Sequence, residues 1–277
     1  MSALFLTRPD GRLAYELHGD TGPLLLCAPG MGELRASFRH LITPLRAAGF
    51  RVAVLDLRGH GQSDARMRPL DDDAVAGDLL ALAELLSPTD PVLLAGNSMS
   101  AGAAVIAAAR APERVRGLAL LGPFVRDGGG AGARLLLGLL LARPWGPAAW
   151  AGYHRRLFPG AVPADHEQYL TAAREALREP GRWAAFRTAT RVRHGAAEAA
   201  LVRVSAPTVV IMGEKAPDWP DPAAEARWIA ERVNADTVLL PGVGHYPQAQ
   251  APAETAAAII ALHARTEDEH GAGRTER

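Results

Sequence analysis

One stretch of the chain decides its fold: Pro91-Val-Leu-Leu-Ala-Gly-Asn-Ser-Met-Ser-Ala-Gly-Ala-Ala-Val-Ile-Ala-Ala-Ala-Arg110. Its first five residues form an apolar run typical of a buried strand, and the alanine-rich segment 101–110 is typical of a helix. Gly96 and Ser100 place small residues two positions before and after Ser98, as close packing of a strand and a helix around a sharp turn requires. The pattern predicts a turn that presents the Ser98 hydroxyl as a nucleophile. The alternative is that Ser98 only caps the helix.

Apolar runs and helical patterns alternate on both sides of this stretch. Two runs, 4–8 and 12–17, flank the turn Pro9-Asp-Gly11 and predict an opening hairpin. Further strands are expected near 23–28, 51–56, 115–121, 206–212 and 237–240, and helices before Ala48 and near 73–86, 222–233 and 252–263. This alternation predicts an α/β fold with a mostly parallel central sheet flanked by helices.

The alternation is interrupted in the middle of the chain. Residues 126–200 show helical patterns and no strand-like run, and they hold three of the five tryptophans. We therefore expect a core in two parts, 1–125 and 201–265, with a helical insertion at 126–200. The charged, glycine-bearing end, 266–277, is expected to be a flexible tail.

A histidine and a second turn complete the pattern of candidate residues. His245 stands in Gly242-Val-Gly-His-Tyr246, directly after the last strand-like run, where it could reach the edge of the sheet as a general base. A purely structural histidine is the alternative. The backbone amides of Met31, after the first buried strand, and Met99, after Ser98, could stabilise a developing oxyanion. The alternative for Pro29-Gly30 is an ordinary turn.

Taken together, these residues resemble the α/β-hydrolase superfamily, in its capped serine-hydrolase type, over about residues 4 to 265. The loop Asp56-Leu-Arg-Gly-His-Gly-Gln-Ser63 is similar to a family motif, and its His60 is expected to hold that loop. The resemblance implies the chain order nucleophile, acid, base, which Ser98 and His245 fit. It also implies that the insertion at 126–200 is a helical cap over the active site.

The position of the acid departs from the family pattern. Members usually carry aspartate where this chain has Ala216, in Gly213-Glu-Lys-Ala216. Alanine cannot orient an imidazole ring. Asp218, two residues further on, is the first substitute, Asp127 is the second, and a site with no acid is the third possibility.

Aromatic residues in the insertion indicate the kind of substrate. An apolar pocket suits a hydrophobic, aromatic small molecule. The substrate-contacting residues expected are Phe124, Trp145, Trp150, Tyr153, Trp183 and Phe186. The reaction expected is hydrolysis of an ester, thioester, lactone or carbon–carbon bond next to a carbonyl. The alternatives are a cofactor-free lyase, oxygenase or bond-forming enzyme of specialised metabolism, and a ligand sensor.

The composition of the chain limits which partners, cofactors and metals are expected. Thirty basic and thirty acidic residues give no net charge, which argues against nucleic acid or an anionic membrane as a partner. The single cysteine, Cys27, allows neither an internal disulfide nor a cysteine-built metal site. No phosphate loop, dinucleotide fingerprint or zinc-type motif is present, so no cofactor and no metal are expected. The longest apolar run, 135–142, is too short to span a bilayer. A cytoplasmic monomer or homodimer is expected.

Overall fold

The computed structural model of the protein describes residues 3–128, 131–142 and 144–275, and its centre is an eight-stranded sheet. In chain order the strands are β1 (Leu4–Arg8), β2 (Gly11–His18), β3 (Leu24–Ala28), β4 (Arg51–Leu55), β5 (Val92–Asn97), β6 (Val115–Leu121), β7 (Thr208–Gly213) and β8 (Asp236–Leu240). Their order across the sheet is β1-β2-β4-β3-β5-β6-β7-β8. The pairs β1/β2 and β2/β4 are antiparallel, and the other pairs are parallel. The predicted fold and opening hairpin are confirmed.

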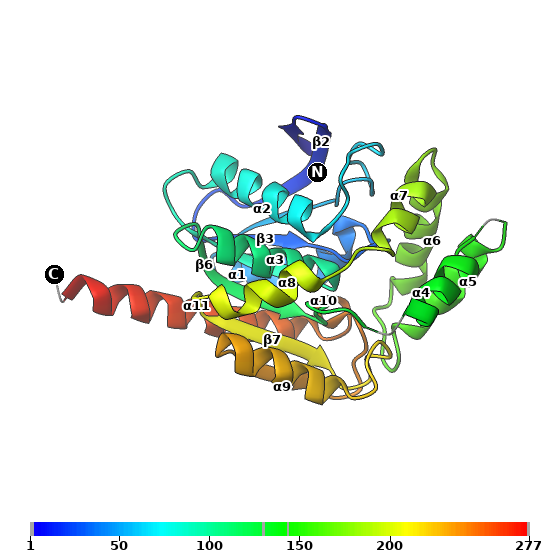
Figure 1. Cartoon of the computed structure of the whole chain (residues 1–277). Coiled ribbons are helices and arrows are strands. Elements are labelled where there is room, and N and C mark those ends of the chain that lie inside the picture. The colour runs from blue at the N-terminus through cyan, green and yellow to red at the C-terminus, as the bar shows by residue number, and fades with distance from the viewer. Residues whose placement is uncertain (1–2, 129–130, 143, 276–277) are drawn as a thin grey trace.

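Helices cover both faces of the sheet (Figure 1). On one face lie α2 (Asp72–Leu86), α3 (Met99–Arg110) and α9 (Pro222–Val233), which share one hydrophobic cluster. On the other face lie α1 (Arg39–Ala47) and α11 (Pro252–Thr275), which share a second cluster. Short elements connect them: η1 (Arg35–Phe38), η2 (Leu201–Arg203) and α10 (Pro247–Gln250).

The central strands are buried on both faces. Every residue of β3, β5 and β7 is buried, which explains their unbroken apolar runs. Because β3 to β8 run parallel, their carboxyl ends meet at one edge of the sheet. The residues that follow these strands therefore converge there, as ligand-binding residues do in open α/β sheets.

Residues 126–200 form helices, without a strand in their described part. The helices are α4 (Ala131–Leu140), α5 (Gly146–Arg156), α6 (His166–Arg178), α7 (Arg182–Ala189) and α8 (Gly195–Ala200). Figure 1 shows α4 to α7 gathered on one side of the sheet. Trp150, Leu170 and Phe186 belong to a hydrophobic cluster distinct from the two on the faces of the sheet. Ala197 and Ala200 of α8 pack in the cluster around α3, and so do Ala185 and Ala189 of α7, so both helices also contact the core.

The end of the chain differs from the flexible tail expected from the sequence. Helix α11 continues from Pro252 to Thr275 and carries the charged segment 266–270 within it. After Pro252 the helix meets no further proline, and its first glycine is Gly271, so nothing in 253–270 interrupts it. In the described part of the chain, no helix is both long and apolar enough to cross a membrane.

Candidate active site

Ser98 occupies a sharp turn between β5 and α3. Its backbone has φ 59° and ψ −126°, a conformation that residues other than glycine rarely adopt. Gly96 lets the strand and the helix approach each other, because a Cβ atom there would lie 2.3 Å from the backbone oxygen of Ser100. Ser98 is 3% exposed. The turn predicted from the sequence is present, and it holds Ser98 in a strained backbone conformation.

The need for glycine at this turn can be tested with a matched pair. Gly96→Ala is expected to lower the free energy of unfolding by about 1–3 kcal/mol, because its Cβ would meet backbone atoms that cannot rotate away. Gly152→Ala is the control, since Gly152 lies exposed inside α5 with nothing within 4 Å of its Cβ position. That change is expected to stabilise the protein by about 0.5–1 kcal/mol. Urea unfolding measures both, and an unaltered Gly96→Ala protein would refute the close approach.

The loop after β3 lies against Ser98. A Cβ atom on Gly30 would lie 2.9 Å from the Cβ of Ser98. The Ser100 hydroxyl, which stands where the family usually has glycine, donates a 2.6 Å hydrogen bond to the carbonyl of Pro29. This bond ties the loop to the turn. Met31 follows Gly30 and Met99 follows Ser98, so both belong to the two segments that meet at this contact.

His245 is held in the loop after β8 by contacts to its backbone. Its amide donates to the carbonyl of Leu157 at 2.9 Å. The Asn97 side chain, one residue before Ser98, donates to the carbonyls of His245 at 3.1 Å and Leu121 at 2.9 Å. The sequence pattern does not single out Asn97, because the carbonyls that its side chain binds come from distant segments. In the described residues no hydrogen bond joins the Ser98 hydroxyl to His245 directly, and Asn97 links their two loops.

The structure brings Asp218 to His245. The Nδ1 atom of His245 lies 2.8 Å from Oδ2 of Asp218, and both side chains are nearly buried. The other carboxylate oxygen, Oδ1, accepts a 3.0 Å hydrogen bond from the Tyr153 hydroxyl. Burial acts to raise the pKa of Asp218, but His245 and Tyr153 outweigh it and the pKa lies below its usual value. Asp218 therefore carries a negative charge beside the imidazole at neutral pH.

Asp127, the second candidate for the acid, and Ala216, which stands at the usual position of the acid, have other surroundings. Asp127 accepts from the Arg193 side chain and, at 2.9 Å, from the backbone amide of His194. Ala216 is buried in a tight turn in which its amide donates to the carbonyl of Gly213 at 3.1 Å. Two residues after Ala216, the carboxylate of Asp218 contacts His245.

Comparison with known proteins places the chain in a family. A model described as the alpha/beta hydrolase family matches residues 24–258. The chain belongs to the alpha/beta hydrolase family. It is 28% identical over 259 residues to a monoacylglycerol lipase of Mycolicibacterium smegmatis, a match that covers 84% of this chain and 86% of that protein. Together, the family and its hydrolytic members support a hydrolytic enzyme.

Solved structures of this family share the fold over most of the chain. An esterase from Thermogutta terrifontis superposes with a TM-score of 0.78 at 24% identity, over 96% of this chain and 99% of its own. An enol-lactonase from Burkholderia xenovorans superposes with a TM-score of 0.76 at 20% identity, over 96% and 100%. At these identities the likeness shows the fold alone.

Three of the aromatic residues expected to contact the substrate in this alpha/beta hydrolase lie close to the candidate site. Phe124 contacts the His245 ring edge-on, with centroids 5.8 Å apart. Trp150 and Phe186 pack against each other at 4.6 Å and both lie beside Gly32, next to Met31. These three aromatic residues therefore lie against the loops that carry the site.

The remaining aromatic residues of the substrate hypothesis have other surroundings. Tyr153 contacts Asp218, as described, and so supports the acid. Trp183 packs on Phe186 with centroids 5.1 Å apart. Trp145 is 56% exposed, and its indole NH donates to the carbonyl of Leu139 within the insertion. The structure does not bring Trp145 to the site.

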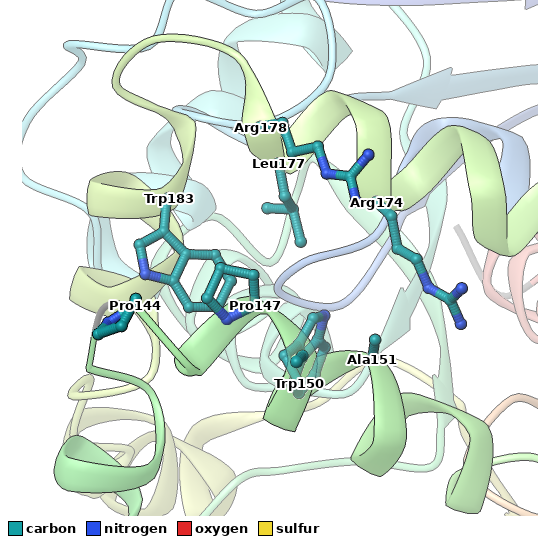
Figure 2. Close-up of a pocket in the computed structure, with 9 residues that line it drawn as sticks. Pro144, Pro147, Trp150, Ala151, Arg174, Leu177, Arg178 and Trp183 are labelled. Carbon is teal, nitrogen blue, oxygen red and sulfur yellow. The ribbon is translucent and has the colours of Figure 1, made fainter.

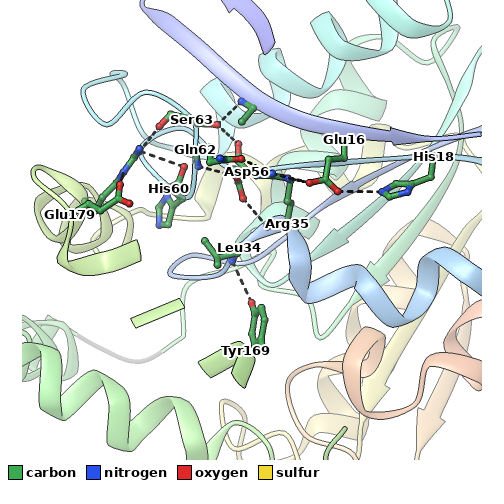
Figure 3. Close-up of polar contacts among 12 residues, drawn as sticks. Glu16, His18, Leu34, Arg35, Asp56, His60, Gln62, Ser63, Tyr169 and Glu179 are labelled. Atoms are coloured by element: carbon green, nitrogen blue, oxygen red, sulfur yellow. Dashed lines mark hydrogen bonds and ion pairs between the residues drawn. The ribbon is translucent and has the colours of Figure 1, made fainter. Parts of the chain in front are cut away.

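The family loop beginning at Asp56 is a structural support (Figure 3). Asp56 is fully buried and accepts from the amides of Arg35 at 2.8 Å and Gln62 at 2.9 Å. His60 is buried, and its Nδ1 lies 3.0 Å from the carbonyl of Arg58. Burial lowers the pKa of His60, which keeps the ring neutral. These contacts fit the expected role of His60 in holding its loop.

A buried carboxylate, missed by the sequence analysis, connects the insertion to the site. Glu33, 1% exposed, pairs with Nε2 of His154 on α5 and accepts from the hydroxyls of Tyr169 on α6 and Tyr246, the residue after His245. Burial acts to raise the pKa of Glu33, but His154 and the two tyrosines outweigh it and the pKa lies below its usual value. Among the described residues, no cluster of three or more histidine, cysteine or acidic side chains could hold a metal ion.

Removal of the Glu33 charge is expected to destabilise the fold. Glu33→Gln removes the buried charge that His154, Tyr169 and Tyr246 contact, and removal of one member of such a buried network costs about 3–5 kcal/mol in the free energy of unfolding. Glu179→Gln is the control, since the Glu179 side chain is 60% exposed and its pair with Arg182 is worth about 0–1 kcal/mol. Because folding lowers the Glu33 pKa, its contribution is present above about pH 4.5 and is lost as the pH falls further. Urea unfolding of both variants at pH 7 and pH 4 tests the size of the loss and its pH dependence. Equal losses of unfolding free energy in Glu33→Gln and Glu179→Gln at pH 7 would contradict the prediction.

Proposed function

We propose that the protein is a serine hydrolase in which Ser98 is the nucleophile, His245 the general base and Asp218 the acid that orients it. The observation that carries this proposal is the 2.8 Å contact between Asp218 and Nδ1 of His245, at the sheet edge where Ser98 occupies its strained turn. A histidine fixed through Nδ1 presents Nε2 as the atom that can accept a proton.

The reaction follows from these roles. The Ser98 oxygen attacks the substrate carbonyl while Nε2 of His245 takes the hydroxyl proton. The carbonyl oxygen becomes an oxyanion, which the amides of Met31 and Met99 would stabilise. The intermediate collapses to an acyl-Ser98 enzyme, and His245 returns its proton to the leaving alcohol. Water then attacks the acyl group with the same residues in the same roles, which releases the acid and restores Ser98.

The proposed substrate is a carboxylic ester or lactone with a hydrophobic body. Phe124, Trp150 and Phe186 lie beside His245 or the Met31 loop, and such aromatic walls favour apolar ligands. The relative named as a monoacylglycerol lipase supports the same bond type. Hydrolysis of a thioester, or of a carbon–carbon bond next to a carbonyl, belongs to the wider class of reactions expected for this site.

A fluorophosphonate probe tests the proposal because it phosphonylates only an activated serine. The wild-type protein is expected to gain one phosphonyl group at Ser98 by mass spectrometry, and Ser98→Ala none. Ser100→Gly restores the family residue two positions away and is expected to label like the wild type. Absence of labelling in a folded wild-type protein, or equal labelling of Ser98→Ala, would overturn the assignment and favour a non-hydrolytic role on this fold.

A further inference from the structure

The insertion contains a cavity that is separate from the proposed active site (Figure 2). Its volume is about 410 Å³, within the range of small-molecule sites. It lies between α5, α6 and α7, and its lining residues are Pro144, Pro147, Ala148, Trp150, Ala151, Arg174, Leu177, Arg178 and Trp183. Neither Ser98, Asp218 nor His245 is among them.

The walls of the cavity are mainly apolar. The indole rings of Trp150 and Trp183 and the side chain of Leu177 line the cavity, and all three residues are less than 9% exposed. Such walls suit an aliphatic or aromatic body. Trp150 also separates the cavity from the site, since it lies against Gly32, beside the loop of Met31.

Two cationic side chains lie on the other side of this cavity. Figure 2 shows Arg174 and Arg178 of α6 across from Trp183. The Nε and Nη2 atoms of Arg174 are buried and have no hydrogen-bond partner among the described residues. The indole NH of Trp183 is buried and unpartnered in the same way.

The carboxylates on and beside α6 do not neutralise these groups. Glu167 pairs with Arg155, Glu179 with Arg182, and Asp165 with Arg39. The remaining carboxylate of α6, Glu175, forms no ion pair with Arg174 or Arg178 among the described residues. A buried guanidinium NH without an acceptor costs free energy, and a carboxylate is the acceptor that its planar geometry fits best. The unpaired donors would bind an anionic group, and the apolar walls would bind a hydrophobic body of the same ligand.

We propose that this cavity is a second binding site, which holds a small carboxylic acid with a hydrophobic body. The carboxylate accepts from Arg174, with Arg178 adding positive charge at the rim. The hydrophobic body packs between Trp150, Trp183 and Leu177. Ester hydrolysis produces acids of this chemical kind, but the site needs neither Ser98 nor turnover to bind them.

Calorimetric titration of the Ser98→Ala protein tests the site independently of the proposed reaction. The probe is 4-phenylbutyrate, and its neutral isostere 4-phenylbutyramide is the control ligand. The acid is expected to bind at least ten-fold more tightly than the amide, because only the acid supplies an anion to Arg174. Equal affinities, or no binding of the acid at several millimolar, would refute the site.

Variants then place the binding in this cavity. Arg174→Gln is expected to weaken acid binding about ten-fold or more, as loss of a hydrogen bond to a charged group does, and Ala151→Trp, which fills the cavity, is expected to abolish it. Arg155→Gln removes a positive charge outside the cavity and is expected to leave the affinity unchanged. Circular dichroism confirms that each variant is folded. Unchanged affinity in both Arg174→Gln and Ala151→Trp would show that the acid binds elsewhere and overturn the proposal.

Discussion

Replacement of Ser98 with alanine is expected to lower the kcat of ester hydrolysis by about 10⁴–10⁶-fold, since no other group can form the acyl intermediate. His245→Ala is expected to cost about as much, because the hydroxyl is a weak nucleophile until a base takes its proton. The double variant is expected to be no slower than either single one. Initial rates on a chromogenic ester of a hydrophobic acid measure all three.

Non-additivity is the decisive part of this prediction. Ser100→Gly serves as the control, since it keeps the Ser98 turn and removes only the hydroxyl that binds Pro29. It is expected to retain most of the activity. Losses that multiply in the double variant would mean that Ser98 and His245 act independently, which would contradict their proposed roles.

Asp218→Asn is expected to lower kcat by about 10⁴-fold, as replacement of the acid by its amide does in a serine protease triad. The amide can donate to Nδ1 of His245 and so stabilise the wrong tautomer, which leaves Nε2 protonated before the reaction. The KM should change little, because Asp218 supports His245 rather than the substrate. Steady-state kinetics separates the two parameters.

Asp127→Asn is the matched control for this substitution. Asp127 binds Arg193 and the amide of His194, so its amide variant is expected to stay within a few-fold of wild-type activity. If Asp127→Asn proves as damaging as Asp218→Asn, the acid has been misassigned. Full activity in Asp218→Asn would mean that His245 works without a carboxylate partner.

The fold and two of the proposed site residues, Ser98 and His245, could be predicted from the sequence because local patterns encode them. The turn around Ser98 needs small residues at fixed offsets, and buried parallel strands need unbroken apolar runs, so both leave a mark within a few residues. The sequence predicts His245 as the base in the same way, from its place after the last strand. Asp218 could only be ranked above Asp127, since reach across a loop depends on the path of the backbone from Gly213.

What sequence reasoning missed depends on contacts between distant segments. Asn97 reaches a carbonyl 148 positions away, and Tyr246 reaches Glu33 across 213 positions. No local pattern marks such partners, because asparagine, glutamate and tyrosine are common at surfaces as well. The same reason explains Tyr153, which sequence reasoning placed in the substrate pocket and the structure places on Asp218.

The contacts of α5 have a consequence for how this enzyme could diversify. Tyr153 of this helix supports Asp218, and Leu157, directly after it, accepts from the amide of His245. The segment that shapes the substrate pocket therefore also holds two members of the proposed triad. Exchange of this segment for that of another family member would alter turnover together with selectivity, so that each new specificity must be selected with its own support for the acid and the base.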